Sequence, residues 1–180
     1  PAQTIPDKPL AEKEQLKSAR LMRVNHTGEV CAQALYQGQA LTARNSAVTG
    51  IMQHAAEEEC DHLVWCETRL QELNTHTSFL NPFFYLGSMA MGAFVGALGD
   101  RTNLGFLAAT EDGVVQHLTN HLTELPKDDD KSRAIVTTMR EDESRHAHHA
   151  IEYGGRPFPV LARRIMDGMS RLMTKTTYWF

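Results

Sequence analysis

Glu59 and His62 are the first residues in the chain whose types and spacing suggest chemistry. They stand three positions apart in a segment with a helical pattern, so their side chains project from one face, a turn apart. A carboxylate and an imidazole in this arrangement can bind one metal ion from a single helix. The same spacing returns at Glu143 and His146. Two such pairs alone are weak evidence for a metal site.

A duplication makes the evidence stronger. A lone glutamate precedes each pair: Glu29 lies 30 positions before Glu59, and Glu111 lies 32 positions before Glu143. Superposing residues 21–73 on residues 103–153 aligns these ligands at offsets of 82 to 84 positions. Four carboxylates and two imidazoles on four helices are the ligand set of a di-iron carboxylate bundle. The candidate metal ligands are Glu29, Glu59, His62, Glu111, Glu143 and His146.

Four helical segments must position these ligands. The apolar pattern predicts helices over about 11–44, 47–73, 100–125 and 130–153. In the second helix the Glu59 and His62 pair replaces apolar residues in the middle of the core face, whereas Glu29 falls beside the apolar face predicted for the first helix. That face consists of Leu21, Val24, Gly28, Cys31, Leu35 and Gly38. We therefore predict an all-α, ferritin-like four-helix bundle of two pseudo-repeated helical pairs, forming a single domain over residues 1–180.

The ligand types favour iron or manganese. Burying an ionised glutamate without a partner costs many kcal/mol, so a cation is expected, and no arginine on the predicted core faces of the first half is well placed to supply it. Carboxylates are hard donors, and six of these ligands leave open positions on two iron ions, which oxygen activation requires. Glu59 and Glu143 are the candidates to bridge the ions, with Glu29 and Glu111 as terminal ligands. No catalytic residue beyond the ligands is predicted.

Each ligand histidine also needs an acceptor for its other ring nitrogen. Glu58 and Asp142 each precede a ligand glutamate by one position and so are rotated about 100° toward the adjacent helix. They are candidate partners for the histidine across the bundle, although both could equally be surface charges. Surface or structural roles are expected for the remaining histidines, which are His26, His54, His76, His117, His121, His148 and His149.

Three segments lie outside the predicted bundle. Residues 1–10 resemble a tail. Residues 82–99 form an uncharged insertion with four glycines, too short and too interrupted to favour membrane spanning, which leaves a buried core helix or a helix lying in a membrane interface. Residues 158–180 form a basic amphipathic helix with an aromatic end, which either packs on the bundle or attaches to an anionic membrane surface.

Composition limits the function classes. A net charge of −4 without a long basic run gives no reason to expect a nucleic-acid partner. Three cysteines at spacings that fit neither a zinc site nor a disulfide framework favour a reducing compartment. No cleavable signal or transit segment is evident at the start of the chain.

Several motifs together resemble the demethoxyubiquinone hydroxylases of ubiquinone biosynthesis, a family of the ferritin-like superfamily. The resemblance extends from about Leu21 to the C-terminus. It rests on the segments Arg23-Val24-Asn25-His26-Thr27-Gly28-Glu29, Glu59-x-x-His62, Thr110-Glu111-Asp112 and Arg140-Glu141-Asp142-Glu143-x-x-His146. It implies the six metal ligands named above and two iron ions per chain.

The resemblance also implies an activity. A family member adds one oxygen atom from O2 to 2-polyprenyl-3-methyl-6-methoxy-1,4-benzoquinone or its quinol, as a peripheral protein at the cytoplasmic face of a bacterial inner membrane. Leu118 departs from the family, because several members have a tyrosine there beside a histidine, here His117. The roles of His117 and Leu118 are therefore left open. Whether the chain forms a homo-oligomer is also left open.

The chain has no Gly-x-Gly-x-x-Gly dinucleotide fingerprint. Electrons are therefore expected from an external donor, which is NADH bound in another way, a partner protein or the reduced quinol itself. Two other hypotheses are a ferritin-like iron-storage bundle, against which the uncharged segment 82–99 argues, and a plain helical bundle with buried ion pairs and no metal.

Overall fold

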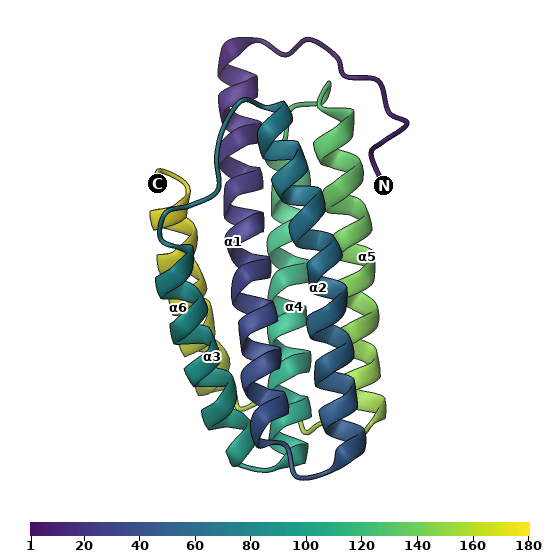
Figure 1. Cartoon of the computed structure of the whole chain (residues 1–180), viewed down its shortest axis with the longest axis vertical. Helices are drawn as coiled ribbons and strands as arrows, with labels where there is room; N and C mark the ends of the chain where they lie inside the picture. Colours follow the sequence, from purple (N-terminus) through teal and green to yellow (C-terminus); the bar gives the residue numbers. More distant parts are fainter.

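The computed structural model describes residues 1–180 and consists of six α-helices without strands. Four long helices form a bundle in which the first and fourth run in one direction and the second and third run in the other, and two shorter helices lie along one flank of it (Figure 1). The bundle helices are α1 (Glu12–Thr42), α2 (Ser46–Glu72), α4 (Asp100–Glu124) and α5 (Asp130–Glu152). The flanking helices are α3 (Asn81–Ala97) and α6 (Val160–Thr177). The predicted all-α, ferritin-like bundle with an apolar insertion and a C-terminal helix is confirmed.

Local signals in the sequence explain where the bundle helices begin and end. The Asn45 side chain accepts a hydrogen bond from the backbone N–H of Ala47 at the start of α2, and Asp129 accepts one from Ser132 at the start of α5. Both are N-caps that satisfy free amides of the first turn. Gly154 follows α5 with a φ of 96°, a backbone conformation that glycine adopts without strain. The predicted boundaries lie within about two residues of the observed ones.

The core consists of two apolar clusters, one on each side of the ligand positions. One cluster includes Met22, Leu118 and Met139, and the other includes Met52 and Leu107. On every bundle helix the ligand residues lie between the part that enters the first cluster and the part that enters the second. The bundle therefore surrounds its buried polar layer with apolar packing at both ends.

The apolar face predicted for α1 turns only partly toward the bundle core, where Leu21 belongs to the first apolar cluster. Leu35 and Gly38 lie instead against α3, where a Cβ on Gly38 would collide with the backbone of Met89. The fully buried residues of α1 include Glu29 and Tyr36, which face the other bundle helices. Because α1 is covered by α3 on one side and by the bundle on the other, its apolar residues do not share one helical phase.

Helix α3 docks on α1 through glycines and exposes its opposite face. Gly92 packs directly on the carbonyl of Leu35, leaving no room for a side chain. On the outer face Phe83 is 76% exposed and Phe94 is 64% exposed. The alternative of a buried core helix is therefore wrong. None of the six helices combines the length and the apolar character that crossing a membrane requires.

Helix α6 is held to the bundle mainly at its ends. Arg163 makes an ion pair with Asp112 of α4 at 2.5 Å, and Ser78 donates a hydrogen bond to the backbone carbonyl of Phe180 at 2.8 Å. Arg20 of α1 lies over the ring of Trp179 at 4.1 Å. Most large apolar side chains of α6 are exposed. They are Val160, Leu161, Ile165, Met169 and Leu172.

Residues 1–10 form no helix but are anchored by charge. Asp7 pairs with Arg69 of α2 at 3.1 Å, and Lys8 pairs with Asp130 of α5 at 2.6 Å. The predicted tail is thus an extended arm across the ends of α2 and α5.

Candidate metal centre

The six candidate ligands converge inside the bundle from four helices. Glu29 comes from α1, Glu59 and His62 from α2, Glu111 from α4, and Glu143 and His146 from α5. All are buried, with at most 8% of any residue exposed. Their donor atoms form two groups, within each of which the atoms lie no more than 4.8 Å apart. The first group is Glu29, Glu59, His62 and Glu143, and the second is Glu59, Glu111, Glu143 and His146.

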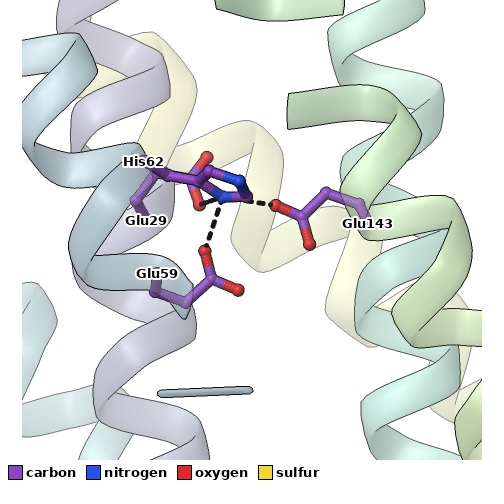
Figure 2. A group of neighbouring side chains, drawn as sticks. All are labelled: Glu29, Glu59, His62 and Glu143. Carbon is purple, nitrogen blue, oxygen red and sulfur yellow. Dashed lines mark hydrogen bonds and ion pairs between the residues drawn. The ribbon is translucent and has the colours of Figure 1, made fainter. Parts of the chain in front are cut away.

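The first group is centred on His62 (Figure 2). Its Nδ1 lies 3.0 Å from Glu59 Oε2, 3.0 Å from Glu143 Oε1 and 3.7 Å from Glu29 Oε2. Figure 2 shows the carboxylates around the same edge of the imidazole, with Glu143 approaching from the opposite side of the bundle. One nitrogen and three carboxylates from three helices thus share one small volume.

The second group repeats this pattern around His146. Its Nδ1 lies 3.2 Å from Glu143 Oε2, 3.5 Å from Glu111 Oε1 and 4.0 Å from Glu59 Oε1. Glu143 therefore presents one oxygen to each histidine, and so does Glu59. The two carboxylates that belong to both groups are those predicted to bridge two ions.

The outer nitrogens of both histidines contact carboxylates of the facing helix. His62 Nε2 lies 3.1 Å from Asp142 Oδ2, and His146 Nε2 lies 2.7 Å from Glu58 Oε2. These are the partners that the sequence suggested. An Nε2–H that donates to a carboxylate leaves Nδ1 as the ligand atom and fixes the ring orientation.

Burial and mutual repulsion disfavour the ionised form of two of the clustered glutamates. Burial and the charges of Glu143 and Glu29 raise the pKa of Glu59 well above its usual range, and burial together with Glu143 does the same to the pKa of Glu111. Burial alone would also raise the pKa of Glu143, but hydrogen bonds from His146 and His62 lower it to about 2.

The pKa values of the two clustered histidines are raised. Burial lowers their pKa values, but hydrogen bonds with the carboxylates outweigh it and raise the pKa of His146 to about 11 and that of His62 further still. The free cluster therefore holds protons that a metal cation would replace.

The donor set fits a pair of metal ions. Two buried carboxylate oxygens of the cluster, Glu59 Oε1 and Glu111 Oε2, have no hydrogen-bond partner, and Glu143 Oε1 has only its ion-pair contact with His62 Nδ1 at 3.0 Å. Orphaned buried oxygens are costly unless something cationic neutralises them. No arginine does so: Arg69 is buried on the same helix as Glu59, but its guanidinium pairs with Asp129, Glu72 and Asp7 at the end of the bundle. Metal ions could satisfy this layer in place of the protons.

One residue at the centre was not predicted. The hydroxyl of Tyr36 donates a hydrogen bond to Glu111 Oε1 across the bundle. Burial and the charge of Glu111 raise the pKa of Tyr36 well above its usual range, so the hydroxyl keeps its proton. The signal that could have found it is its spacing, seven positions and two helical turns after Glu29.

Comparison with known proteins agrees with this geometry. The family model for ubiquinone biosynthesis protein COQ7 matches residues 16–177. The chain belongs to the COQ7 family. A COQ7 relative from Nitrosomonas eutropha, named 3-demethoxyubiquinol 3-hydroxylase, is 54% identical over 179 residues, which cover 99% of this chain and 86% of the relative.

Other relatives carry the same name. A 3-demethoxyubiquinol 3-hydroxylase from Stutzerimonas stutzeri is 57% identical over 169 residues, covering 94% of this chain and 79% of the relative. One from Pseudomonas savastanoi pv. phaseolicola is 54% identical over 178 residues, covering 99% and 83%. The resemblance to demethoxyubiquinone hydroxylases is therefore confirmed at the family level.

The histidines outside the centre are either exposed or buried away from the six clustered residues. His54, His76, His148 and His149 are exposed. His121 is buried, and its Nδ1 lies 2.7 Å from Asn25 Oδ1. The rings of His117 and His121 are 4.0 Å apart, and His117 Nε2 is buried without a partner.

Proposed function

We propose that the chain is a di-iron monooxygenase that hydroxylates a polyprenyl demethoxybenzoquinol with O2 in ubiquinone biosynthesis. The observation that carries this proposal is the pair of overlapping ligand groups that share Glu59 and Glu143. The names of the COQ7 relatives supply the substrate class, a quinol lacking one methoxy group.

Two iron ions per chain would be held by the six clustered residues. When bound, the iron pair supplies the reduction and activation of O2. Glu29 and His62 would hold one ion and Glu111 and His146 the other, with Glu59 and Glu143 between them. Glu58 and Asp142 hold the imidazoles in place through Nε2, and the apolar clusters on either side keep bulk water from the layer. The electron donor is external, NADH or the quinol itself.

A paired measurement tests this function. Anaerobically iron-loaded protein is expected to contain about two irons per chain and to convert a demethoxyquinol in the presence of O2 and a reductant. Glu143→Ala removes a shared ligand and is expected to abolish both iron binding and turnover, whereas Glu141→Ala, an exposed residue two positions earlier on α5, retains both. Iron uptake without quinol turnover would favour a storage bundle, and turnover by the Glu143 variant would contradict the assignment.

We also propose that the chain is a peripheral protein at the cytoplasmic face of a bacterial inner membrane. Support comes from the exposed apolar residues of α3 and α6, both of which pack on α1. Phe83 and Phe94 on α3, and Ile165 and Leu172 on α6, are each more than half exposed. Exposed basic residues on α6, among them Arg171, suit an anionic leaflet. Such a surface would bring the centre close to a substrate with a polyprenyl tail.

Vesicle binding tests the membrane proposal. The protein is expected to co-sediment with phosphatidylethanolamine and phosphatidylglycerol vesicles, and the double variant Ile165→Glu, Leu172→Glu is expected to stay in the supernatant. Val64→Glu changes an apolar residue of α2 that is 58% exposed away from these helices, and it should bind like the parent. Absence of binding by the parent protein, or equal loss in the Val64 variant, would contradict the proposed face.

A further inference from the structure

Tyr36 and Glu111 join two helices of the bundle through a buried hydrogen bond. The Tyr36 hydroxyl of α1 donates to Oε1 of Glu111 on α4 at 2.5 Å, and neither residue has measurable exposure. The second oxygen of Glu111 is buried without a hydrogen-bond partner. The bond therefore fixes the rotation of this carboxylate and leaves Oε2 for a cation.

The matching ligand in the other half of the chain has no such partner. Tyr36 stands seven positions after Glu29, and the residue seven positions after Glu111 is Leu118. By the internal repeat, Leu118 occupies on α4 the position that Tyr36 occupies on α1. It is buried in the apolar cluster with Met22. No side-chain hydroxyl donates to Glu29, whose nearest basic atom is His62 Nδ1 at 3.7 Å.

We propose that Tyr36 is a positioning residue that makes the two halves of the metal centre unequal. It restrains Glu111 as a fixed ligand of the ion shared with His146, while Glu29, with only Leu118 at the matching position, stays free to rotate on the ion shared with His62. The ion at Glu29 is then the one whose carboxylate can move aside for another ligand. This inference rests on the proposed di-iron centre.

The asymmetry is measurable without turnover. Mössbauer spectra of the anaerobic, iron-loaded parent protein are expected to show two distinct ferrous doublets of equal area, and iron titration should show two binding steps. In Tyr36→Phe the doublet of the Glu111 ion should move toward the other one, with a loss of affinity of about 10-fold to 100-fold in one step, as for other partners that orient a ligand. Tyr85→Phe is the matched control, because it removes a tyrosine hydroxyl that donates to Gln37 of α1 away from the ligands.

Leu118→Tyr gives a second, independent measurement. It places a hydroxyl at the matching position near Glu29 and should make the doublets more alike by shifting the Glu29 ion, with its binding step becoming tighter. Circular dichroism of each metal-free variant establishes whether it is folded. If Tyr36→Phe does not fold, the spectrum and iron affinities of Leu118→Tyr test the inference. Folded variants with the spectrum and both affinities of the parent protein would overturn the inference.

The outcomes separate this inference from the function it rests on. A parent protein that binds fewer than two irons contradicts the di-iron centre itself. A parent protein that binds two irons and turns over quinol, but shows a single doublet that Tyr36→Phe leaves unchanged, contradicts only the role of Tyr36.

Discussion

Individual side chains at the metal centre depend on carboxylates that are not ligands themselves. Glu58 contacts His146 Nε2 at 2.7 Å, and Asp142 contacts His62 Nε2 at 3.1 Å. Each is contributed by the helix opposite its histidine. The contacts therefore orient two ligands and also link α2 to α5 on both sides of the centre.

Removing one of these partners should weaken metal binding without removing a ligand. Glu58→Ala leaves His146 free to rotate, and we expect metal affinity in a chelator competition to fall about 10-fold to 100-fold. The adjacent Glu57→Ala, which changes an exposed residue, is the control and should keep the parent affinity. Equal affinities in the two variants would show that the contact with Glu58 does not orient the ring.

His121 makes stability depend on pH independently of the metal. Burial, followed by the neighbouring His117, lowers the pKa of His121 to about 2, whereas an unfolded histidine has a pKa of about 6.5. The unfolded chain therefore binds a proton more readily, and the free energy of unfolding falls as the pH drops below about 6.5. From pH 7 to pH 5 this one group should remove up to about 2 kcal/mol.

The measurement is urea unfolding at both pH values. His121→Gln keeps a donor for Asn25 without a titrating group, so its loss of stability between pH 7 and pH 5 should be smaller than that of the parent by this amount. His148→Gln, at an exposed site, is the control. Parallel losses in the parent and the His121 variant would contradict the assignment.

The convergence of the six candidate ligands was predictable because glutamates and histidines recur at matching offsets in the two halves of the chain. The contacts of Glu58 and Asp142 could also be suggested, since each stands one position before a ligand. The spacing of Tyr36 from Glu29 places it on the same helix face, but a tyrosine in an apolar helix looks like an ordinary core residue until the partner of its hydroxyl is known. That partner lies 75 positions away along the chain.

At the scale of elements, helix boundaries were predictable from caps and breakers, but the orientation of α1 was not. Its residues Leu35 and Gly38 belong to the contact with α3, a helix that lies outside the four-helix core. A sequence pattern records that a position is buried, not which neighbour covers it. The sequence therefore left the placement of residues 82–99 open between two alternatives.

The docking of α3 can be tested at its closest approach. Gly92→Val introduces a side chain where the Leu35 carbonyl already lies, so α3 should separate from α1 while the bundle stays folded. We expect faster proteolysis between residues 78 and 100 with nearly unchanged helix content by circular dichroism. Gly87→Val, at an exposed glycine of α3 with no atom near its Cβ position, should resist proteolysis like the parent protein.

At the scale of the whole molecule, one buried ion cluster joins the two halves and the N-terminal arm. Arg69 of α2 is 2% exposed and contacts Asp129 at 2.9 Å, Ser132 at 3.0 Å and Asp7 at 3.1 Å. Asp129 is also the N-cap of α5. A single guanidinium therefore fixes the end of α2, the start of α5 and the arm relative to one another.

Replacing Arg69 should destabilise the whole fold. Arg69→Leu leaves Asp129 buried without its cation, and we expect a loss of about 3–5 kcal/mol in the free energy of unfolding. Arg163→Leu breaks the much more exposed pair with Asp112 and should cost less than about 1 kcal/mol. Chemical denaturation of the metal-free proteins measures both, and similar losses would mean that burial does not govern these pairs.

The exposed faces of α3 and α6 also affect how the purified protein behaves. In aqueous buffer without detergent, aromatic and aliphatic side chains such as Phe83 and Ile165 have only one another to cover them. Self-association through these faces would then occur in the test tube whatever assembly the cell contains. Particle mass measured in a mild detergent, compared with the mass in plain buffer, distinguishes an assembly built on other surfaces from one that forms through these apolar faces.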